Sequence, residues 1–250
     1  MQTSSNALRT SYAPTETADL YPESDGKPMA ETDHHIEAIL RMRLIFRGYY
    51  ADTPDVYISG NLMMYYEDTR PPKAVSPDIL ISFGVGKKPR RTYKIWEEGK
   101  PPDFVVEFSS KSTVQNDLNN KMELYARLGI SEYFLCDVDR RYLPAPLMGF
   151  RLVDGEYVEI APNANGGISS ETLGLDFHLL ADGFRIYDPV TGKWLQTPEE
   201  AANSRAERDR ERAERDRERA ERDRERAERA ETELAGLREE LARLKGNSSQ

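Results

Sequence analysis

The sequence predicts an α/β domain that is followed by a long, charged helix. Apolar residues recur at helical spacing between Met29 and Gly48, whereas short segments between Asp55 and Asp137 alternate apolar and polar residues as strands do. After Thr197 the chain is dominated by charged residues that repeat with a period of seven. These patterns predict a domain of helices and a sheet, and a separate helical tail.

The predicted elements of the domain follow in the order helix, three strands, helix and strand. Their expected ranges are 29–48 for the first helix, 55–66, 78–83 and 104–109 for the strands, 114–128 for the second helix and 132–137 for the last strand. The segment 55–66 reads as a strand or a bulged hairpin around Gly60. Alternation on both sides of Asp154-Gly155 predicts a hairpin over 150–160 that extends or covers the sheet. Further short elements are expected at 172–180 and 184–188.

The chain is expected to divide into four segments. Residues 1–28 are polar and contain three prolines, so they are expected to form a disordered arm. The α/β domain should span 29–196 and the charged heptad-repeat helix 197–246, with a disordered end at 247–250. Thr197, Pro198 and Glu200 form a capping box that marks the start of the tail helix.

The tail repeat favours a single helix over most of its length. Asp209, Asp216 and Asp223 occupy the heptad position where a coiled coil needs an apolar residue. Pairs of Glu and Arg four residues apart can stabilise the isolated helix, each by roughly 0.2–0.5 kcal/mol. An apolar seam follows, formed by Ala227, Ala230, Leu234, Leu237, Leu241 and Leu244. It predicts a weak homodimer or a docking site for a partner helix, with a solvated single helix as the alternative.

Composition narrows the classes of partner. The net charge is −9, of which about −7 lies outside the tail, so bulk charge does not favour nucleic-acid binding. The best candidate for contact with nucleic acid is a local basic cluster formed by Lys87, Lys88, Arg90, Arg91 and Lys94. The alternative is that this cluster is an ordinary solvated loop. The single cysteine, Cys136, excludes an intrachain disulfide and a four-cysteine zinc site. No apolar stretch of membrane-spanning length occurs, and we expect a cytoplasmic protein without membrane contact.

Two acidic residues on predicted strands suggest a metal site. Asp78 opens one strand, and Glu107 lies in the next with Val105 and Ser109 on its face. Carboxylates among apolar neighbours are costly unless a cation compensates them. In the helix over 114–128, Lys121 stands where the apolar stripe should continue. We therefore predict that Asp78 and Glu107 bind a divalent cation and that Lys121 faces them.

Each of these residues also has a structural interpretation. Asp78 can simply begin a strand, Glu107 can face solvent, and Lys121 can form a surface pair with Asp117 one helical turn earlier. His34 and His35 are interpreted as helix-surface residues, because neither has a metal-ligand partner at a recognisable spacing.

The chain resembles the Uma-type restriction endonuclease family of the PD-(D/E)XK nuclease superfamily over about residues 21–142. The motifs that carry the resemblance are Gly26-Lys27-Pro28-Met29-Ala30-Glu31, Pro77-Asp78, Trp96-Glu97-Glu98-Gly99, Val106-Glu107, Asp117 through Lys121 to Tyr125, and Glu132-Tyr133. The resemblance implies a restriction-endonuclease-like core with a central mixed sheet. It also implies Mg(II) or Mn(II) at Asp78 and Glu107, and hydrolysis of DNA phosphodiester bonds.

The resemblance suggests further site residues and includes departures from the family pattern. Glu31 is implied as a catalytic acid from the first helix, although a glutamate there can equally complement the helix dipole. The usual lysine two residues after the glutamate is Ser109 here, and the resemblance places the lysine at Lys121 instead. Lys111 is a rival, because Ser110-Lys111 replaces the usual Ser-Pro.

The leading functional hypothesis is a metal-dependent DNA endonuclease. The alternative is a nuclease-fold binding or regulatory module without turnover, which assembles through the C-terminal helix. An intact set of Asp78, Glu107 and Lys121 favours the enzyme, and failure to bind a divalent cation would favour the module.

Overall fold

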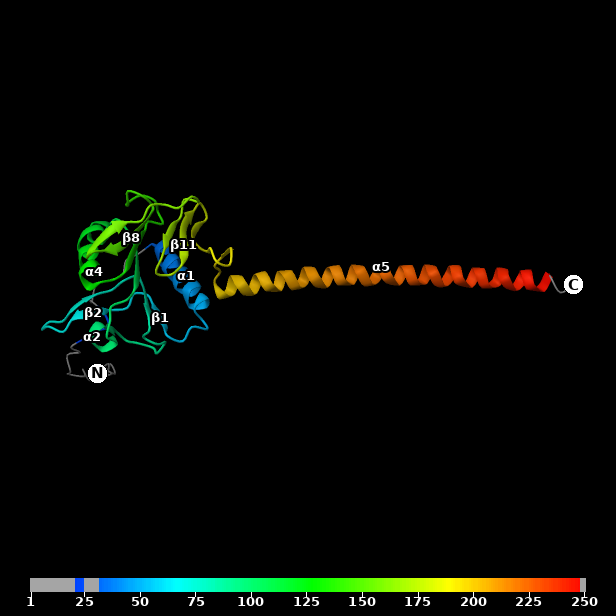
Figure 1. Ribbon diagram of the computed structural model, residues 1–250, viewed down its shortest axis with the longest axis horizontal. Helices are drawn as coiled ribbons and strands as arrows, with labels where there is room; N and C mark the ends of the chain where they lie inside the picture. Colours follow the sequence, from blue (N-terminus) through cyan, green and yellow to red (C-terminus); the bar gives the residue numbers. More distant parts are fainter. Residues whose placement is uncertain (1–20, 25–31, 248–250) are drawn as a thin grey trace, which may run out of the picture. The chain divides into compact units, whose positions relative to one another are not determined.

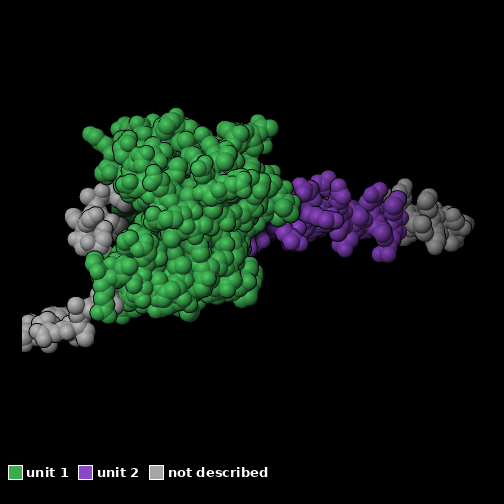
Figure 2. Space-filling view, turned by 60° about the vertical axis from the view of Figure 1, so that its left-hand side comes forward, with its two compact units in different colours: residues 1–195 green, residues 196–250 purple. Residues whose placement is uncertain are grey.

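The computed structural model describes residues 21–24 and 32–247, with side chains described up to residue 239. The chain forms two compact units, residues 1–195 and 196–250, coloured separately in Figure 2. The expected disordered end beyond residue 247, most of the expected arm, and Glu31 lie outside the described residues. Residues 21–24, which belong to the expected arm, contact the body: the Tyr65 hydroxyl donates to the carbonyl of Pro22 at 2.6 Å.

A six-stranded mixed sheet forms the centre of the first unit (Figure 1). Its strands, in spatial order, are β1 (Val56–Ser59), β4 (Ile79–Phe83), β6 (Phe104–Phe108), β7 (Glu132–Cys136), β8 (Leu147–Val153) and β9 (Glu156–Glu159). β6 and β7 run parallel, and all other neighbours are antiparallel. The predicted α/β class with a central mixed sheet is therefore confirmed.

Helix α1 (Asp33–Tyr49) and a second sheet cover one face of the central sheet (Figure 1). The second sheet contains β10 (Ile168–Ser170), β11 (Leu175–Leu180), β12 (Gly183–Asp188) and β13 (Lys193–Trp194). Between these layers the rings of Phe104, Phe134 and Phe177 are in mutual contact, with centroids 4.7–5.4 Å apart. Aromatic packing of this kind dominates core energetics, so it holds the two sheets together.

The other face carries the second helix and a small sheet. The helix consists of α3 (Val114–Asn116), a π-helical segment (Asp117–Lys121) and α4 (Met122–Leu128). The small sheet contains β2 (Met64–Glu67), β3 (Lys73–Val75) and β5 (Tyr93–Lys94), and the short helix α2 (Ile95–Glu98) follows it. Leu80, Val105 and Tyr133 project from the central sheet into this layer. Glu107 lies on the same side, because it alternates with its β6 neighbours.

The segment 55–66 differs from the prediction. β1 pairs with β4 in the central sheet, while β2 pairs with β3 and β5, so the two halves belong to different sheets rather than to one strand or hairpin. Gly60 lies at the point of separation. A Cβ atom there would be 2.8 Å from the Asp78 carbonyl oxygen, so only glycine permits this approach of the two main chains.

The predicted hairpin at Asp154-Gly155 is confirmed and extends the central sheet. Both residues have positive φ, 51° and 88°, as a type I′ turn requires. The first helix forms as predicted, but only some of its regularly spaced apolar residues are buried. Ile36, Leu40 and Leu44 are exposed, and the buried residues are His35, Ala38, Ile39, Met42, Ile45 and Phe46.

The tail forms one helix, α5 (Pro198–Asn247), and begins with the predicted capping box. Glu200 N donates to Thr197 Oγ1 at 3.2 Å, and Thr197 N donates to Glu200 Oε2 at 2.9 Å. The expected ion pairs four residues apart are present at Glu211–Arg215, Glu218–Arg222 and Glu225–Arg229, with separations of 3.5–3.7 Å. None of the helices in the described part of the chain is long and apolar enough to span a membrane.

Candidate functional site

Asp78 and Glu107 lie side by side at one end of the two central strands that carry them. β4 and β6 are antiparallel with Ile79 opposite Val106, and the same register places Asp78 opposite Glu107. Each of the two carboxylates also accepts a hydrogen bond from a main-chain N–H group. Asp78 N donates to Glu107 Oε2 at 3.2 Å, and the N–H of Phe108 donates to Asp78 Oδ2 at 2.7 Å. Both carboxylates are therefore held by the backbone of the neighbouring strand.

The π-helical segment brings Lys121 and Asp117 to the same point. Lys121 Nζ lies 2.9 Å from Glu107 Oε2 and 3.0 Å from Asp117 Oδ1. The helical pair with Asp117 is present, but it is not a surface pair, because Asp117 is 1% exposed. Such π segments often occur at functional sites. Lys121 thus connects the helix to the strand that carries Glu107.

The cluster contains more negative than positive formal charge. Glu107 and Asp117 share the ammonium group of Lys121, and the third carboxylate, Asp78, lies beside Glu107. Burial is the largest cause of a raised pKa at Glu107, and together with the neighbouring Asp78 and Asp117 it brings the value to about 8 against the opposing effects of Lys121 and Tyr125. Burial alone would lower the pKa of Lys121, but Glu107 and Asp117 outweigh this effect and raise it. Lys121 therefore stays protonated at neutral pH.

Hydroxyl groups orient the two most deeply buried carboxylates. Tyr125 in α4 donates to Glu107 Oε1 at 2.6 Å, and burial raises the pKa of this hydroxyl, so it remains a donor. Ser109, which follows β6, donates to Asp117 Oδ2 at 3.1 Å. Ser109 occupies the position of the lysine that the family resemblance implies, and it holds Asp117 instead. The side-chain positions in the cluster are thus set by several elements.

His35 approaches Asp78 from helix α1. Its side chain is buried, and Nε2 lies 3.8 Å from Asp78 Oδ2, too far for a hydrogen bond but close enough for an ion pair when the ring is protonated. The interpretation of His35 as a surface residue was therefore wrong, because the buried face of α1 includes it. His34 is exposed as expected, and 78% of its side-chain surface is accessible.

Two surface hollows are lined in part by Lys121 and by His35, the side chains that contact the carboxylates. Lys121 lines one of about 340 Å³, together with residues of β2, β3 and α4. His35 and Lys111 line another of about 400 Å³. Lys111 is exposed, whereas the Lys121 side chain is only 15% exposed and contacts Glu107 directly. Of the predicted site residues, the structure thus brings Asp78, Glu107 and Lys121 together.

The basic loop that precedes α2 is largely charge-compensated. Arg90 donates to both oxygens of Glu98 at 2.7 Å, and Lys94 lies 3.0 Å from Glu97. Arg91 pairs with Glu23. Most of the positive charge in the cluster 87–94 is therefore neutralised within the molecule, as expected for a loop with a structural role.

Sequence reasoning missed two members of the cluster and the polar role of a third. Asp117 could have been found, since a lysine in an apolar stripe indicates that a neighbour one turn away also faces inward. Tyr125 follows Lys121 by one helical turn and belongs to the apolar stripe of the same predicted helix, and a buried tyrosine generally needs a partner for its hydroxyl. His35 had no comparable signal, because helical spacing fits more than one buried face of α1.

Comparison with known proteins assigns the family. A family model described as "Putative restriction endonuclease", Uma2, matches residues 24–182. Among solved structures, a "putative nuclease belonging to DUF820" from Anabaena variabilis ATCC 29413 is 15% identical, with a TM-score of 0.41 over 57% of this chain and 77% of that chain. No curated protein matches the chain. Because the family model spans more than half of its length, this chain belongs to the Uma2 family of restriction-endonuclease-like proteins.

Proposed function

We propose that the protein is a divalent-metal-dependent endonuclease that hydrolyses DNA phosphodiester bonds. The observation that carries the proposal is the cluster of three carboxylates around one lysine, at the end of two adjacent central strands. A buried cluster with excess negative charge is costly unless a further cation binds to it. The family assignment is in keeping with a nuclease.

The donor set fits Mg(II) or Mn(II). Carboxylate oxygens are the ligands that these hard cations prefer, and Asp78 and Glu107 would hold the ion. Among the described residues there is no preformed group of three or more His, Cys, Asp or Glu side chains that could hold a metal. This is compatible with Mg(II), which commonly binds one or two carboxylates and keeps several waters. When bound, the ion would polarise the phosphate and acidify the attacking water.

The residues of the chain would orient and stabilise the reacting groups. Phe108 N–H and the Tyr125 hydroxyl fix the carboxylates of Asp78 and Glu107. Lys121 presents a protonated ammonium group beside Glu107. A permanent cation there favours a role in stabilising the negative charge that develops on the phosphate, rather than a role as general base.

Plasmid nicking and calorimetric titration with Mn(II) test the proposal together. We expect the full chain to nick DNA only with Mg(II) or Mn(II), and chelation to stop the reaction. Asp78→Asn and Glu107→Gln should each abolish nicking and weaken Mn(II) binding while the circular dichroism spectrum is unchanged. Glu159→Gln is the matched control, because it removes the same charge from an exposed residue of the edge strand β9.

Unchanged nicking by either purified active-site variant would refute the assignment of the site. A parent chain that binds DNA without cleaving it would support the alternative of a nuclease-fold module without turnover. Cleavage of RNA but not DNA under the same conditions would retain the chemistry and change the substrate.

We also propose that helix α5 pairs weakly with a second copy or with a partner helix. Leu234 and Leu237 are 48% and 59% exposed on one helix and begin the predicted apolar seam. The side chains of Leu241 and Leu244 lie outside the described residues. Light scattering across a concentration series should give a rising mass for the full chain and a constant mass for a chain cut after Thr197. Equal monomer masses for both would leave α5 as a single helix.

A further inference from the structure

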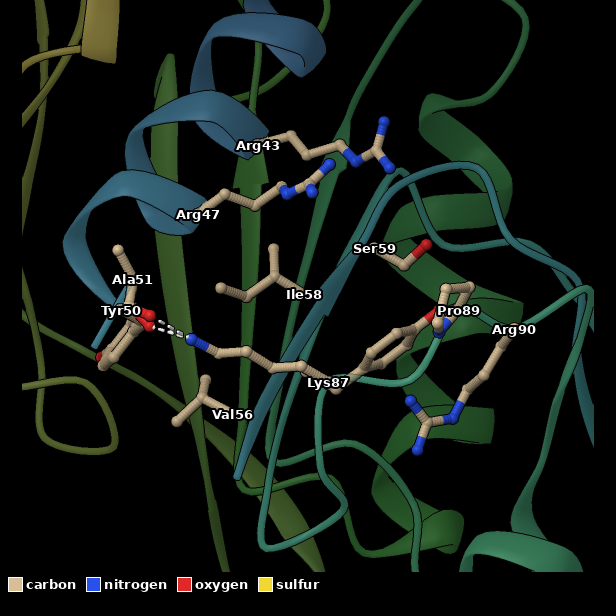
Figure 3. Close-up of a pocket in the computed structure, with 11 residues that line it drawn as sticks. Arg43, Arg47, Tyr50, Ala51, Val56, Ile58, Ser59, Lys87, Pro89 and Arg90 are labelled. Atoms are coloured by element: carbon tan, nitrogen blue, oxygen red, sulfur yellow. Dashed lines mark hydrogen bonds between the residues drawn. The ribbon is translucent and has the colours of Figure 1, made fainter. Parts of the chain in front are cut away.

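A positively charged groove runs beside the edge strand of the central sheet (Figure 3). Its volume is about 440 Å³, and all four residues of β1 contribute to its lining. Arg43 and Arg47 project into it from α1, and Lys87 and Arg90 come from the loop that follows β4. The lining includes no acidic side chain among the described residues. The groove therefore concentrates positive charge on a body that is acidic overall.

Two of the four cations already have partners. The guanidinium of Arg90 is neutralised by both oxygens of Glu98. Lys87 donates to the main-chain carbonyl of Tyr50, just past the end of α1, and to that of Ala51, at 2.7 Å. These contacts stabilise the end of a helix, where lysine side chains are favourable. Arg90 and Lys87 thus have structural roles that explain their presence.

Arg43 and Arg47 have no such explanation. Neither forms an ion pair with the part of the chain that the structure describes. Arg43 is half-buried, and its Nε atom is buried without a hydrogen-bond partner among the described residues. A buried donor that lacks a partner destabilises the folded state until an acceptor reaches it. The two guanidinium groups extend into the same part of the groove in Figure 3.

The groove begins close to the acidic cluster. β1 is antiparallel to β4 with Ser59 opposite Leu80, so the Ser59 end of β1 lies beside the Asp78 end of β4. Gly60 stands between the two sites: a Cβ atom there would be 2.8 Å from the Asp78 carbonyl oxygen and 3.6 Å from Arg43 Cδ. The distance from β1 to β6 is two strand spacings, or about 10 Å. A nucleic-acid strand has one phosphate per about 3.4 Å of helix axis, so that distance corresponds to a few nucleotides.

We infer that this groove binds the phosphodiester backbone of the nucleic-acid strand that enters the acidic cluster, through Arg43 and Arg47. The inference rests on the proposed function and names the surface that holds its substrate. Guanidinium groups bind phosphate oxygens with two parallel hydrogen bonds. The basic loop that the sequence singled out supports this surface, but helix α1 supplies the two arginines that form no ion pair within residues 21–24 and 32–239.

Fluorescence anisotropy with a labelled 20-nucleotide duplex tests the inference on the full chain in EDTA, which halts metal-dependent cleavage. Each of Arg43→Gln and Arg47→Gln should weaken binding by about tenfold, and each should lower the slope of log K against log salt by about 1. Arg47 is exposed, so its variant tests the groove even if Arg43→Gln does not fold. Arg185→Gln is the matched control, because Arg185 pairs with Asp182 outside the groove, and it should bind like the parent.

Equal affinity and equal salt slope for the parent and the Arg43→Gln/Arg47→Gln double variant would overturn the inference. The inference would also be overturned by a second pair of results. In that case inorganic phosphate or a mononucleotide would bind in an Arg43-dependent manner, while binding of the duplex would not depend on either arginine. Arginine-dependent duplex binding by a chain that never cleaves with Mg(II) or Mn(II) would support the groove and refute the proposed hydrolysis. Metal-dependent cleavage with an unchanged KM in the double variant would support the hydrolysis and refute the groove.

Discussion

Glu107 and Glu132 are both buried on adjacent central strands, yet their surroundings differ in kind. Glu132 is 1% exposed at the start of β7, and every group that contacts it is a donor. The Arg151 guanidinium donates twice to Oε1, at 3.0 and 3.1 Å, and the Ser170 hydroxyl donates to Oε2. The main-chain N–H groups of Glu171 and Thr172 complete the set, at 3.0 and 3.3 Å. Glu132 therefore contacts one cation, which it shares with the exposed Glu171, and three further donors that satisfy its lone pairs.

Glu107 is completely buried near the other end of β6 and has acids among its closest neighbours. It shares the ammonium of Lys121 with Asp117 and lies opposite Asp78. The difference separates two uses of a buried carboxylate. A carboxylate surrounded by donors joins strands and is satisfied within the chain. A group of carboxylates with too few cations lowers the stability of the chain, and under the proposed function it would bind a further cation.

The sharpest test of this comparison is the stability of matched variants. In EDTA, Glu132→Gln should lower the free energy of unfolding by about 2–3 kcal/mol, because Arg151 loses its buried partner while its own side chain is 29% exposed. Glu107→Gln should leave the free energy of unfolding at neutral pH nearly unchanged or raise it, because the raised pKa of about 8 already keeps much of the metal-free Glu107 neutral and an amide of the same shape has no charge to bury. Urea unfolding followed by circular dichroism measures both values.

A large loss of stability in Glu107→Gln, similar to that in Glu132→Gln, would show that both carboxylates are structural. Cleavage assays on the same samples complete the comparison. Glu132→Gln should retain the parent rate wherever it is folded, since Glu132 lies at the opposite end of β6 and β7 from Glu107.

The next test replaces each of the two candidate lysines, Lys121 and Lys111, by methionine. Lys121→Met should reduce the single-turnover rate of cleavage by about 10²- to 10⁴-fold, because it removes the cation nearest the proposed reaction centre. Lys111→Met should change that rate much less, since Lys111 is exposed on a turn. Mn(II) binding measured by calorimetry should be largely retained in both variants. The reverse order of rates would move the active lysine to the turn and would leave Lys121 as a structural counter-ion.

Local periodicity was sufficient to predict the half of the site that lies on the central sheet and the second helix. Alternation along β6 places Glu107 on the same face as Val105, and helical spacing places Lys121 in the stripe that covers this face. Neither inference requires knowledge of distant contacts. The π-helical segment was not predicted in this way. Helical spacing indicated only one continuous α-helix over residues 114–128.

Residues that depend on distant packing could not be predicted. Ile36, Leu40 and Leu44 have helical spacing as regular as that of the true buried face of α1. The choice between the two faces is made by contacts such as that of Phe46 with Phe177, whose rings lie 6.1 Å apart and whose positions in the sequence differ by more than a hundred residues. The burial of His35 follows from this choice. For the same reason, the assignment of β2 to a separate sheet was not visible in the sequence.

The smallest expected effects come from removing one serine hydroxyl beside each group of buried carboxylates, the group that contains Glu107 and Asp117 and the surroundings of Glu132. Ser109 donates to Asp117, and Ser170 donates to Glu132 while accepting from the N–H of Leu173 at 3.1 Å. Ser170→Ala should lower the free energy of unfolding by about 1–2 kcal/mol, because a charge-assisted bond is lost and a buried N–H loses its acceptor. It should leave the cleavage rate unchanged.

Ser109→Ala should cost less than 1 kcal/mol, since Asp117 still faces Lys121, but it should reduce the cleavage rate by about tenfold through the altered position of that lysine. Asp117 contacts Lys121 within one helical segment. Because Ser109 would act on the rate through the position of Lys121, a change in KM without a change in kcat would contradict its positioning role. Equal effects of the two alanine variants on stability, with no effect of either on the rate, would remove the distinction between the clusters at the level of their hydroxyl groups. Urea unfolding and single-turnover cleavage on the same preparations decide between these outcomes.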